Sequence, residues 1–245
     1  MIFSLIPYGF LIKGISRVFI TLLIMATLFL KFQINYLEGT PKKGILDPFV
    51  GSGTSLIEAQ RLGRNAIGIE LQRDVAKTAH DLVEQEKAKD FKGTIIVGDS
   101  RTANIGEQLK HFGINKVQFI IYHPPYWDII KFSDNKKDLS NCNTLEEFNN
   151  SFGEVIDNTA QYLEKNRYCA CVIGDKYANS EIVPLGFHCM NLFLFRGFKL
   201  KAILVKNFED TKGKANQKAI WRYRALSSDF YLFKHEYIFV FKKIK

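Results

Sequence analysis

The chain has little of what metal-binding and disulfide-stabilised proteins depend on. Its four cysteines are Cys142, Cys169, Cys171 and Cys189, and they form neither a CxxC pair nor a Cys/His pattern typical of a zinc module. We therefore expect no metal site and a reducing, cytoplasmic location. Cys169 and Cys171 alternate in the apolar run YCACVIG, which predicts two buried thiols on one face of a strand.

Long apolar runs are also scarce. Residues 18–30 form an uncharged, mostly apolar run of 13 residues, shorter than the roughly 20 residues that span a bilayer. We interpret residues 1–43 as an apolar N-terminal segment that contains a buried helix. An altered or membrane-associated segment is the alternative, although a membrane is not the expected partner. The features of a signal peptide are not evident.

Acidic residues, proline and glycine are all in short supply. Six prolines and 17 glycines in 245 residues are too few for a disordered chain, and the length suits one α/β domain. The 25 acidic residues face 34 Lys and Arg, which gives a formal net charge of +9. This excess favours a polyanionic partner such as nucleic acid, with plain solubility as the alternative explanation.

From Lys42 onward, short β-branched runs alternate with amphipathic stretches, a pattern typical of βαβ units around a mostly parallel sheet. Residues 74–89 and 144–165 carry apolar stripes at helical spacing, and Thr144 with Glu147 predicts a capping box. The seven predicted strands are residues 45–47, 66–70, 94–97, 117–122, 168–173, 199–206 and 237–241.

Acidic side chains follow three successive predicted strands. Asp47 precedes a turn with Gly51 and Gly53 and a helix that begins near Thr54, and Glu70 lies 23 residues after Asp47. Asp99 follows the third strand in GTIIVGDS. Because the carboxyl ends of parallel strands share one edge, where open α/β sheets bind their ligands, we expect a nucleoside site there.

The residues of this turn also restrict the ligand. A phosphate-bearing nucleotide would call for a Walker-type lysine or a longer glycine run, whereas Asp47 beside the glycines favours a cationic group. A nucleoside with a positive arm that lacks phosphate fits better. The ligand that we expect is S-adenosylmethionine.

The motif DPFVGSGT followed by HPPY resembles the DNA methyltransferases that methylate exocyclic amino groups. The resemblance runs from about Gly44 to the C-terminus and includes GRNAIGIEL, VGDSR, HPPYWDIIKFSD, RYCACVIGDKY, WRYRAL and KHEYIFVFKK. It implies a methyltransferase domain at 44–245 with a Rossmann-like, seven-stranded sheet whose last strand is antiparallel. The implied cofactor-binding residues are Asp47, Pro48, Phe49, Gly51, Ser52, Gly53, Thr54, Glu70 and Asp99, with Glu70 on the ribose and Asp99 on the adenine.

The HPPY stretch supplies the candidate catalytic residues His123, Pro124, Pro125 and Tyr126. An aromatic amine is a poor nucleophile, so we expect the Pro124 carbonyl and the side chain at 123 to accept its N–H groups. Tyr126 is expected to stack on a base flipped out of the duplex. Trp127 either extends that stacking surface or has a core or lid role.

His123 departs from the family pattern, in which Asp, Asn or Ser usually precedes the two prolines. A neutral imidazole offers one acceptor nitrogen and an imidazolium offers none, so we expect activity to fall as the pH drops through the histidine pKa, near 6.5 if unperturbed. A structural cap is the alternative role for His123. Residues 1–43 do not resemble the family's other cofactor-contacting segment, which suggests an altered start.

The loop at 207–235 lacks long apolar periodicity, and a loop of this length is usually functional or disordered. The predicted nucleic-acid contacts are Lys212, Lys214, Lys218, Trp221, Arg222 and Arg224 of this loop, together with Trp127. Lys206 and Tyr223 belong to the same basic and aromatic stretch. The predicted function is site-specific N4-cytosine or N6-adenine methylation of double-stranded DNA, with a restriction endonuclease as a candidate partner. An RNA base methyltransferase and an inactive DNA-binding remnant are the alternatives, and a solvated loop is the alternative role for 207–235.

Overall fold

The computed structural model describes residues 44–86, 92–207 and 235–244, all of which lie in one compact unit, Thr40–Lys245. The apolar segment 1–43 and its predicted helix at 18–30 lie outside the described residues, as does the interior of the basic loop, 208–234. No helix within the described ranges is long and apolar enough to cross a membrane.

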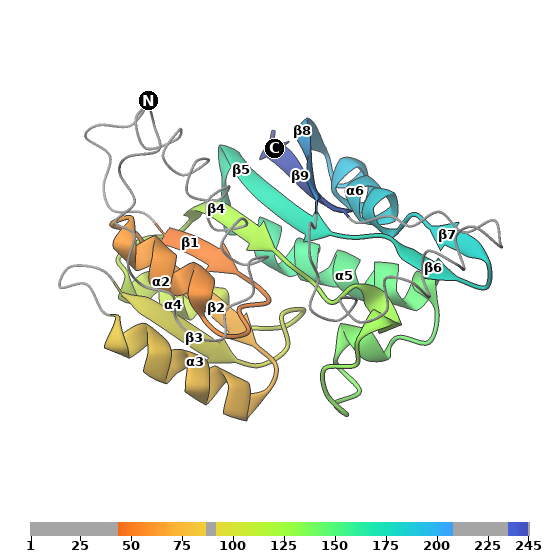
Figure 1. Ribbon diagram of the computed structural model, residues 1–245. Coiled ribbons are helices and arrows are strands. Elements are labelled where there is room, and N and C mark those ends of the chain that lie inside the picture. Colours follow the sequence, from red (N-terminus) through yellow and green to blue (C-terminus); the bar gives the residue numbers. More distant parts are fainter. Residues whose placement is uncertain (1–43, 87–91, 208–234, 245) are drawn as a thin grey trace. The chain divides into compact units, whose positions relative to one another are not determined.

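The centre of the fold is a seven-stranded sheet with the strand order β3-β2-β1-β4-β5-β9-β8 (Figure 1). Neighbouring strands from β3 to β5 pair in parallel, and β9 pairs antiparallel with both β5 and β8. The strands are β1 Gly44–Asp47, β2 Asn65–Glu70, β3 Gly93–Val97, β4 Val117–Tyr122, β5 Leu163–Ile173, β8 Phe198–Asn207 and β9 His235–Lys243. All seven predicted strands and the antiparallel last strand are confirmed.

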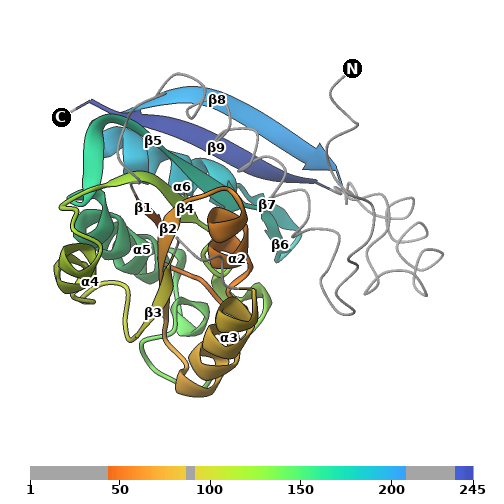
Figure 2. The ribbon, with the colours of Figure 1, turned by 90° about the vertical axis from the view of Figure 1, so that its left-hand side faces the viewer.

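Helices cover both faces of this sheet (Figure 2). On one face lie α2 Thr54–Arg61 and α3 Arg73–Gln85, and on the other lie α4 Ile105–His111, α5 Leu145–Ala160 and α6 Leu185–Phe195. The predicted helices at 74–89 and 144–165 correspond to α3 and α5. Because each layer buries apolar side chains against the sheet, loops at the strand ends are left to form a site.

The predicted end of α5 and the predicted start of β5 were wrong by about five residues, as α5 ends at Ala160 and β5 begins at Leu163. The physical reason is tertiary pairing, because Leu163 is fully buried and pairs with Val117 of β4. The N-cap was predicted correctly, since the Thr144 hydroxyl accepts a 3.1 Å hydrogen bond from the Glu147 amide. The Glu147 carboxylate, however, accepts from the amide of Asn143 at 2.8 Å, one residue before the cap.

Several elements have no counterpart among the predicted ones. α6 is apolar around its whole circumference and α4 has only seven residues, so neither carries a clear helical stripe. A hairpin of β6 Lys176–Ala178 and β7 Glu181–Val183 turns through Asn179 and Ser180, whose φ angles are 52° and 65°. Two short 3-10 turns, η1 Trp127–Ile129 and η2 Leu139–Asn141, lie in the loop after β4.

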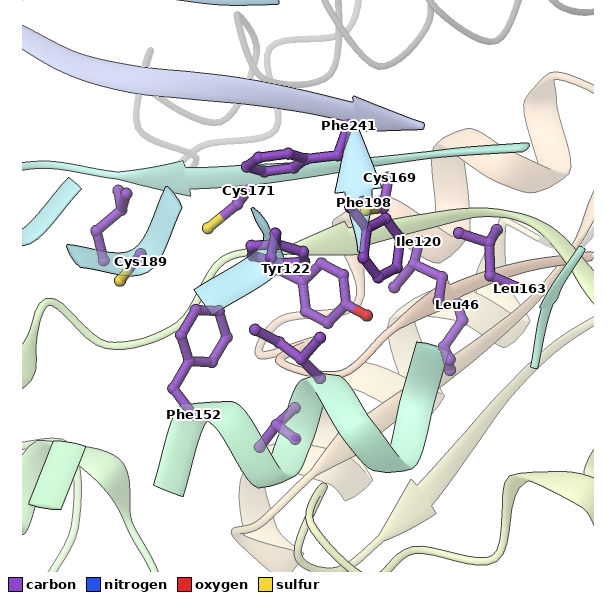
Figure 3. Close-up of a cluster of buried hydrophobic side chains, with 14 of the residues drawn as sticks. Leu46, Ile120, Tyr122, Phe152, Leu163, Cys169, Cys171, Cys189, Phe198 and Phe241 are labelled. Atoms are coloured by element: carbon purple, nitrogen blue, oxygen red, sulfur yellow. The ribbon is translucent and has the colours of Figure 1, made fainter. Parts of the chain in front are cut away.

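Tyr122 fixes the end of β4 inside the core (Figure 3). Its fully buried ring lies edge-on to Phe193 and Phe152, with centroid distances of 5.1 and 6.1 Å, and its hydroxyl is 2.7 Å from the Thr159 Oγ1. Cys169 and Cys171 lie in the same cluster, which confirms that they are buried thiols, and burial raises the pKa of both. The residue that precedes the HPPY loop is thus held rigidly in place.

Candidate functional site

The loops after β1, β2, β3 and β4 lie side by side at the carboxyl edge of the sheet, as the strand order requires. The register pairs Leu46 with Ile120 and Asp47 with Gly68. The Gly-rich turn after β1 and the HPPY loop after β4 therefore begin on adjacent strands. The predicted cofactor and catalytic residues are brought to one edge.

The turn after β1 depends on glycine at two positions. Gly53 has a φ of 81°, and a Cβ there would lie 3.0 Å from Val83 and 3.2 Å from the Ala79 carbonyl oxygen of α3. Gly51 has a φ of 50°, and a Cβ there would meet nothing within 4 Å. The turn is thus packed tightly against α3 at Gly53 and is open at Gly51, where a ligand can approach the backbone.

Hydroxyl groups fix the rest of this turn. The Ser52 and Thr54 hydroxyls lie 3.1 Å apart at the start of α2, and the Ser100 hydroxyl donates to the Pro48 carbonyl at 2.5 Å. The Phe49 ring is half-buried against Phe152, with a centroid distance of 6.1 Å. The hydrogen bond from Ser100 thus joins the turn after β1 to the loop after β3.

Asp47 is a buried carboxylate at the end of β1. Its oxygens accept hydrogen bonds from the Phe49 amide at 2.9 Å and from the Ser55 hydroxyl at 2.5 Å, which are both neutral donors. Burial raises its pKa from 3.8 to about 6, with Glu70 adding to the rise and the two hydrogen bonds opposing it. A charge that is this poorly compensated attracts a cationic ligand.

Glu70 ends β2 and reaches back to the same turn. Its Oε2 accepts from the Gly51 amide at 3.1 Å, and its Oε1 accepts from the Gln72 amide at 2.9 Å. Burial is the main cause that raises its pKa, and Asp138 adds to the rise. Each carboxylate oxygen can accept a further hydrogen bond, as a nucleoside hydroxyl would require.

Asp99 is held differently, because it forms a bidentate ion pair with Arg101. The Arg101 Nη2 and Nε lie 2.8 and 3.1 Å from the Asp99 Oδ2, and the Arg101 amide donates to Oδ1 at 2.9 Å. Burial alone would raise the pKa of Asp99, but the hydrogen bonds and charge of Arg101 lower it. Arg101 was not among the predicted site residues, although the VGDSR segment contains it.

The HPPY loop leaves β4 with Pro124 buried and His123, Pro125 and Tyr126 half-buried. The rings of His123 and Tyr126 lie 5.8 Å apart, and the Tyr126 hydroxyl is 3.4 Å from the His123 Nε2. Burial lowers the pKa of His123, an effect that Lys206 reinforces and Glu236 opposes. At neutral pH the imidazole is therefore neutral and keeps one acceptor nitrogen.

The Tyr126 ring is held by a hydrogen bond at its hydroxyl and by close packing at its Cε2. Its hydroxyl donates to the Glu236 Oε2 at 2.7 Å, and a Cβ on Gly174 would lie only 2.9 Å from its Cε2. Lys206 donates to the other oxygen of Glu236 at 2.9 Å. Glu236 was not predicted and Lys206 was wrongly grouped with the phosphate contacts, although a charged residue inside the apolar run HEYIFVF is a visible signal.

Trp127 has a φ of 52°, an uncommon and strained backbone conformation for a bulky side chain. Its indole Nε1 donates to the Cys142 carbonyl at 2.8 Å, and the Lys176 ammonium lies 4.0 Å from the ring centroid. Lys176 also forms an ion pair with Asp128. These contacts hold the indole within the protein, which favours the core or lid role over an open stacking surface.

The segment after Trp127 is rigid. The Asp138 carboxylate accepts from the Ser140 amide at 2.9 Å and from the Ser133 hydroxyl at 2.7 Å. The Asn141 amide group donates to the carbonyls of Ser133 and Asn135, both at 2.9 Å. Because the Arg101 Nη2 also lies 3.4 Å from the Lys137 carbonyl, this segment is linked to Asp99 after β3, the ion-pair partner of Arg101.

The predicted nucleic-acid contacts outside the HPPY loop are not among the described residues. These are Lys212, Lys214, Lys218, Trp221, Arg222 and Arg224. Lys206, which the sequence pattern grouped with them, is a correction. Its side chain is only 9% exposed and is paired with Glu236, so it cannot also contact a phosphate.

Comparison with known proteins finds sequence similarity in the first part of the site. The family model described as DNA methylase, of the N6 and N4 amino-methylating type, matches residues 37–81, from before β1 to within α3. The type II methyltransferase M2.DpnII of Streptococcus pneumoniae is 52% identical over 42 residues, which is 17% of this chain and 16% of that protein. The similarity thus covers a small part of that relative's length.

Solved structures share the whole fold at low identity. Magnesium protoporphyrin IX methyltransferase from Synechocystis, solved with bound SAH, has a TM-score of 0.57 at 10% identity over 93% of this chain and 84% of that one. A protein from Pyrococcus horikoshii described as an RNA methyltransferase has a TM-score of 0.53 at 15% identity over 95% of this chain and 92% of that one. The chain therefore has the fold of the S-adenosylmethionine-dependent methyltransferases, and its residues 37–81 are similar to the DNA methylase family.

Proposed function

We propose that this protein is a DNA amino-methyltransferase that transfers a methyl group from S-adenosylmethionine to the N4 of cytosine or the N6 of adenine. The observation that carries the proposal is a juxtaposition at one sheet edge. The open turn with Asp47 and Gly51 and the HPPY loop begin on the adjacent strands β1 and β4. Methyl transfer requires the donor and the amino acceptor to be in contact. Two loops on neighbouring strands supply one adjacent site for each.

The residues present fit the cofactor. Asp47 and Glu70 are carboxylates whose hydrogen bonds come from neutral donors, so their charge suits a cation. The turn is open at Gly51, where a ligand can reach the backbone. Asp47 would hold the cationic arm, Glu70 the ribose and Asp99 the adenine. When bound, the cofactor supplies an electrophilic methyl group.

On the acceptor side, the chain must make a weakly nucleophilic amino group reactive. The buried Pro124 directs the backbone of a stiff loop, and its carbonyl is the proposed acceptor for one N–H. The neutral imidazole of His123 is the proposed acceptor for the other. Two fixed acceptors draw the amino nitrogen toward tetrahedral geometry, and the neutral imidazole can receive the proton that the nitrogen loses on methylation.

A double-stranded DNA substrate is supported by the net charge of +9 and by the family of the matching segment. With Lys206 committed to Glu236, five basic residues of the loop 207–235 remain as predicted phosphate contacts. Five such contacts give a log–log slope of about −4.5 for DNA affinity against salt concentration. A restriction endonuclease partner and a role in DNA marking remain predictions.

The deciding experiment is expression in a host that lacks DNA methylation, followed by mass spectrometry of hydrolysed DNA and RNA nucleosides. We expect N4-methylcytosine or N6-methyladenine in DNA and unchanged RNA. Methylated RNA bases with unmodified DNA would support the RNA base methyltransferase instead. Asp47→Ala should abolish the mark, whereas Asp74→Ala, at an exposed position of α3, should leave it unchanged.

Cofactor binding by calorimetry separates an enzyme from an inactive remnant. The wild type should bind S-adenosylmethionine, and Asp47→Ala should bind it more weakly. Undetectable binding by the folded wild type would contradict the proposal, because the turn after β1 is assigned to a cationic nucleoside.

A further inference from the structure

The base side of the site contains a buried ion pair. The Lys206 ammonium lies 2.9 Å from the Glu236 Oε1, and their side chains are only 9% and 2% exposed. Burying two charges carries a desolvation cost that apolar residues of similar size avoid, so such a pair is weak evidence for a stabilising role. A functional reason is needed, and the contacts of the second Glu236 oxygen supply one.

The second oxygen of Glu236 connects the pair to the HPPY loop. The Tyr126 hydroxyl donates to Oε2 at 2.7 Å, and the same hydroxyl lies 3.4 Å from the His123 Nε2. The chain Lys206–Glu236–Tyr126–His123 thus links β8 and β9 to the loop after β4, across 110 residues of sequence between Tyr126 and Glu236.

The donor and the acceptor of each hydrogen bond in this series of four residues can be assigned. Lys206 donates to Glu236, and both Glu236 oxygens act as acceptors, so the Tyr126 proton points toward Glu236. The Tyr126 oxygen can then only accept from His123. A neutral imidazole that donates through Nε2 carries its lone pair on Nδ1.

We propose that Glu236 and Lys206 are positioning residues that act through the Tyr126 hydroxyl to hold His123 in the tautomer protonated at Nε2. Its Nδ1 is then the ring nitrogen that accepts a hydrogen bond from the target amino group. The first part stands on the contacts alone, and the second rests on the proposed function. The wrong tautomer would present an N–H donor to an N–H donor, which prevents the contact.

Nitrogen-15 NMR of the histidine rings tests the tautomer without any substrate, with His123→Asn assigning the signal. We expect the wild type to show an Nε2-protonated neutral ring. Tyr126→Phe, which removes only the hydroxyl, and Glu236→Gln, whose amide can donate to the Tyr126 oxygen, should both shift the ring toward a mixture of tautomers. Glu164→Gln breaks a half-buried ion pair with Arg167 at the other end of β5 and should leave the His123 signal unchanged.

Kinetics provide the second measurement. For Glu236→Gln we expect kcat to fall about tenfold with cofactor affinity unchanged, a smaller effect than the roughly 100-fold loss of an acid–base group itself. In the Tyr126→Phe background, Glu236→Gln should have little further effect on kcat, because the two residues act in series. Additive effects, or a weaker cofactor affinity that matches the lost kcat, would indicate a merely structural role.

The outcomes separate this proposal from the proposed function. A His123 signal that is the same in wild type, Tyr126→Phe and Glu236→Gln overturns the positioning role, whatever the activity. A protein without methyl transfer overturns the proposed function, while the NMR result still decides the tautomer. If Glu236→Gln fails to fold, Tyr126→Phe alone decides, since it removes no charge and leaves the ring in contact with Gly174.

Discussion

The two halves of the carboxyl edge differ in whether a cationic side chain compensates their carboxylates. In the half formed by β1 and β2, Asp47 and Glu70 accept hydrogen bonds only from amides and a hydroxyl among the contacts described above. In the half formed by β4, β8 and β9, Glu236 is paired with Lys206 and bonded to Tyr126. The first half is left with excess negative charge, and the second is neutral.

This difference corresponds to two kinds of ligand. Uncompensated carboxylates attract a cation, whereas a neutral surface with fixed acceptors suits an uncharged aromatic base. The match to the DNA methylase family model covers residues 37–81, which include β1 and β2 of the first half. The proposed cofactor side therefore coincides with a known motif, whereas the proposed base side depends on contacts between distant strands.

The largest effect should come from His123, which tests whether the second half works through neutral acceptors. We expect His123→Ala to lower kcat about 100-fold or more, and His123→Asn, which keeps an acceptor oxygen, to retain more activity. Because burial lowers the pKa of His123, wild-type kcat should stay constant through pH 6.5 and fall only below it. A pH profile of kcat from about 5 to 8 measures this. An identical acid limb in His123→Asn would show that His123 is not the titrating acceptor.

The next largest effect concerns the excess charge of the first half. Asp47→Asn removes a carboxylate whose pKa rises from 3.8 to about 6 on folding. A raised carboxyl pKa destabilises the fold increasingly as the pH rises from about 4 through 6, by at most about 3 kcal/mol at neutral pH. We expect Asp47→Asn to unfold at a higher temperature than wild type at pH 7, with the difference shrinking toward pH 4, while cofactor affinity drops at least about tenfold.

Thermal unfolding at pH 4, 5.5 and 7, with calorimetry of cofactor binding, measures both changes in Asp47→Asn. Asp81→Asn, at an exposed position in the interior of α3, is the matched control and should alter neither. Lower stability of Asp47→Asn at pH 7 would mean that the hydrogen bonds to Phe49 and Ser55 outweigh the cost of the buried charge.

A smaller effect is expected from the contact that seats Tyr126. In Gly174→Ala the new methyl group would lie 2.9 Å from the Tyr126 Cε2, closer than such atoms normally approach, so the ring must shift. We expect kcat to fall about tenfold with little change in cofactor affinity, because the shift is confined to the base side. Gly106→Ala in α4, where the nearest atom is at 3.4 Å, is the control. Equal kcat values for the two variants would contradict the role of the Tyr126 contact.

The smallest effect should follow from Lys176→Met, which keeps the apolar stem but removes the ion pair with Asp128 and the ammonium above Trp127. Contacts of this kind contribute about 1 kcal/mol or less. We expect a small decrease in the urea midpoint and an increase of about twofold in the KM for DNA. Lys201→Met, on the exposed edge of β8, should change neither quantity. A large loss of kcat in Lys176→Met would instead place Lys176 in the catalytic site.

The positions of the strands were predictable because β-branched runs such as VQFIIY are both buried and locally consistent with a strand, whereas the antiparallel last strand was implied only by the family resemblance. The acids at the strand ends were predictable for the same reason, since each ends a recognisable run. The whole-surface apolarity of α6 and the shortness of α4 hid those helices from any periodic pattern. The start of β5 was set by its pairing with β4, which no local sequence contains.

The candidate site divides in the same way. Asp47 and Glu70 could be assigned from motif and spacing, whereas Glu236 and Lys206 could not, because they lie 110 and 80 residues after Tyr126 and only the folding of β9 and β8 brings them to it. The charge of Glu236 inside an apolar strand was visible, but its partner was not. Arg101 was likewise visible two residues after Asp99, but the sequence does not show that it forms an ion pair with Asp99.

The reactivity of the four buried cysteines can report how often the folded chain opens. Burial raises the pKa of all four thiols, which keeps them protonated and shielded from thiol reagents while the chain is folded. Modification should therefore proceed only through opened molecules. A ligand that binds the folded chain lowers the population of those molecules, so the rate of labelling becomes a direct titration of ligand affinity. Candidate nucleosides and oligonucleotides can be ranked in this way without a methylation assay.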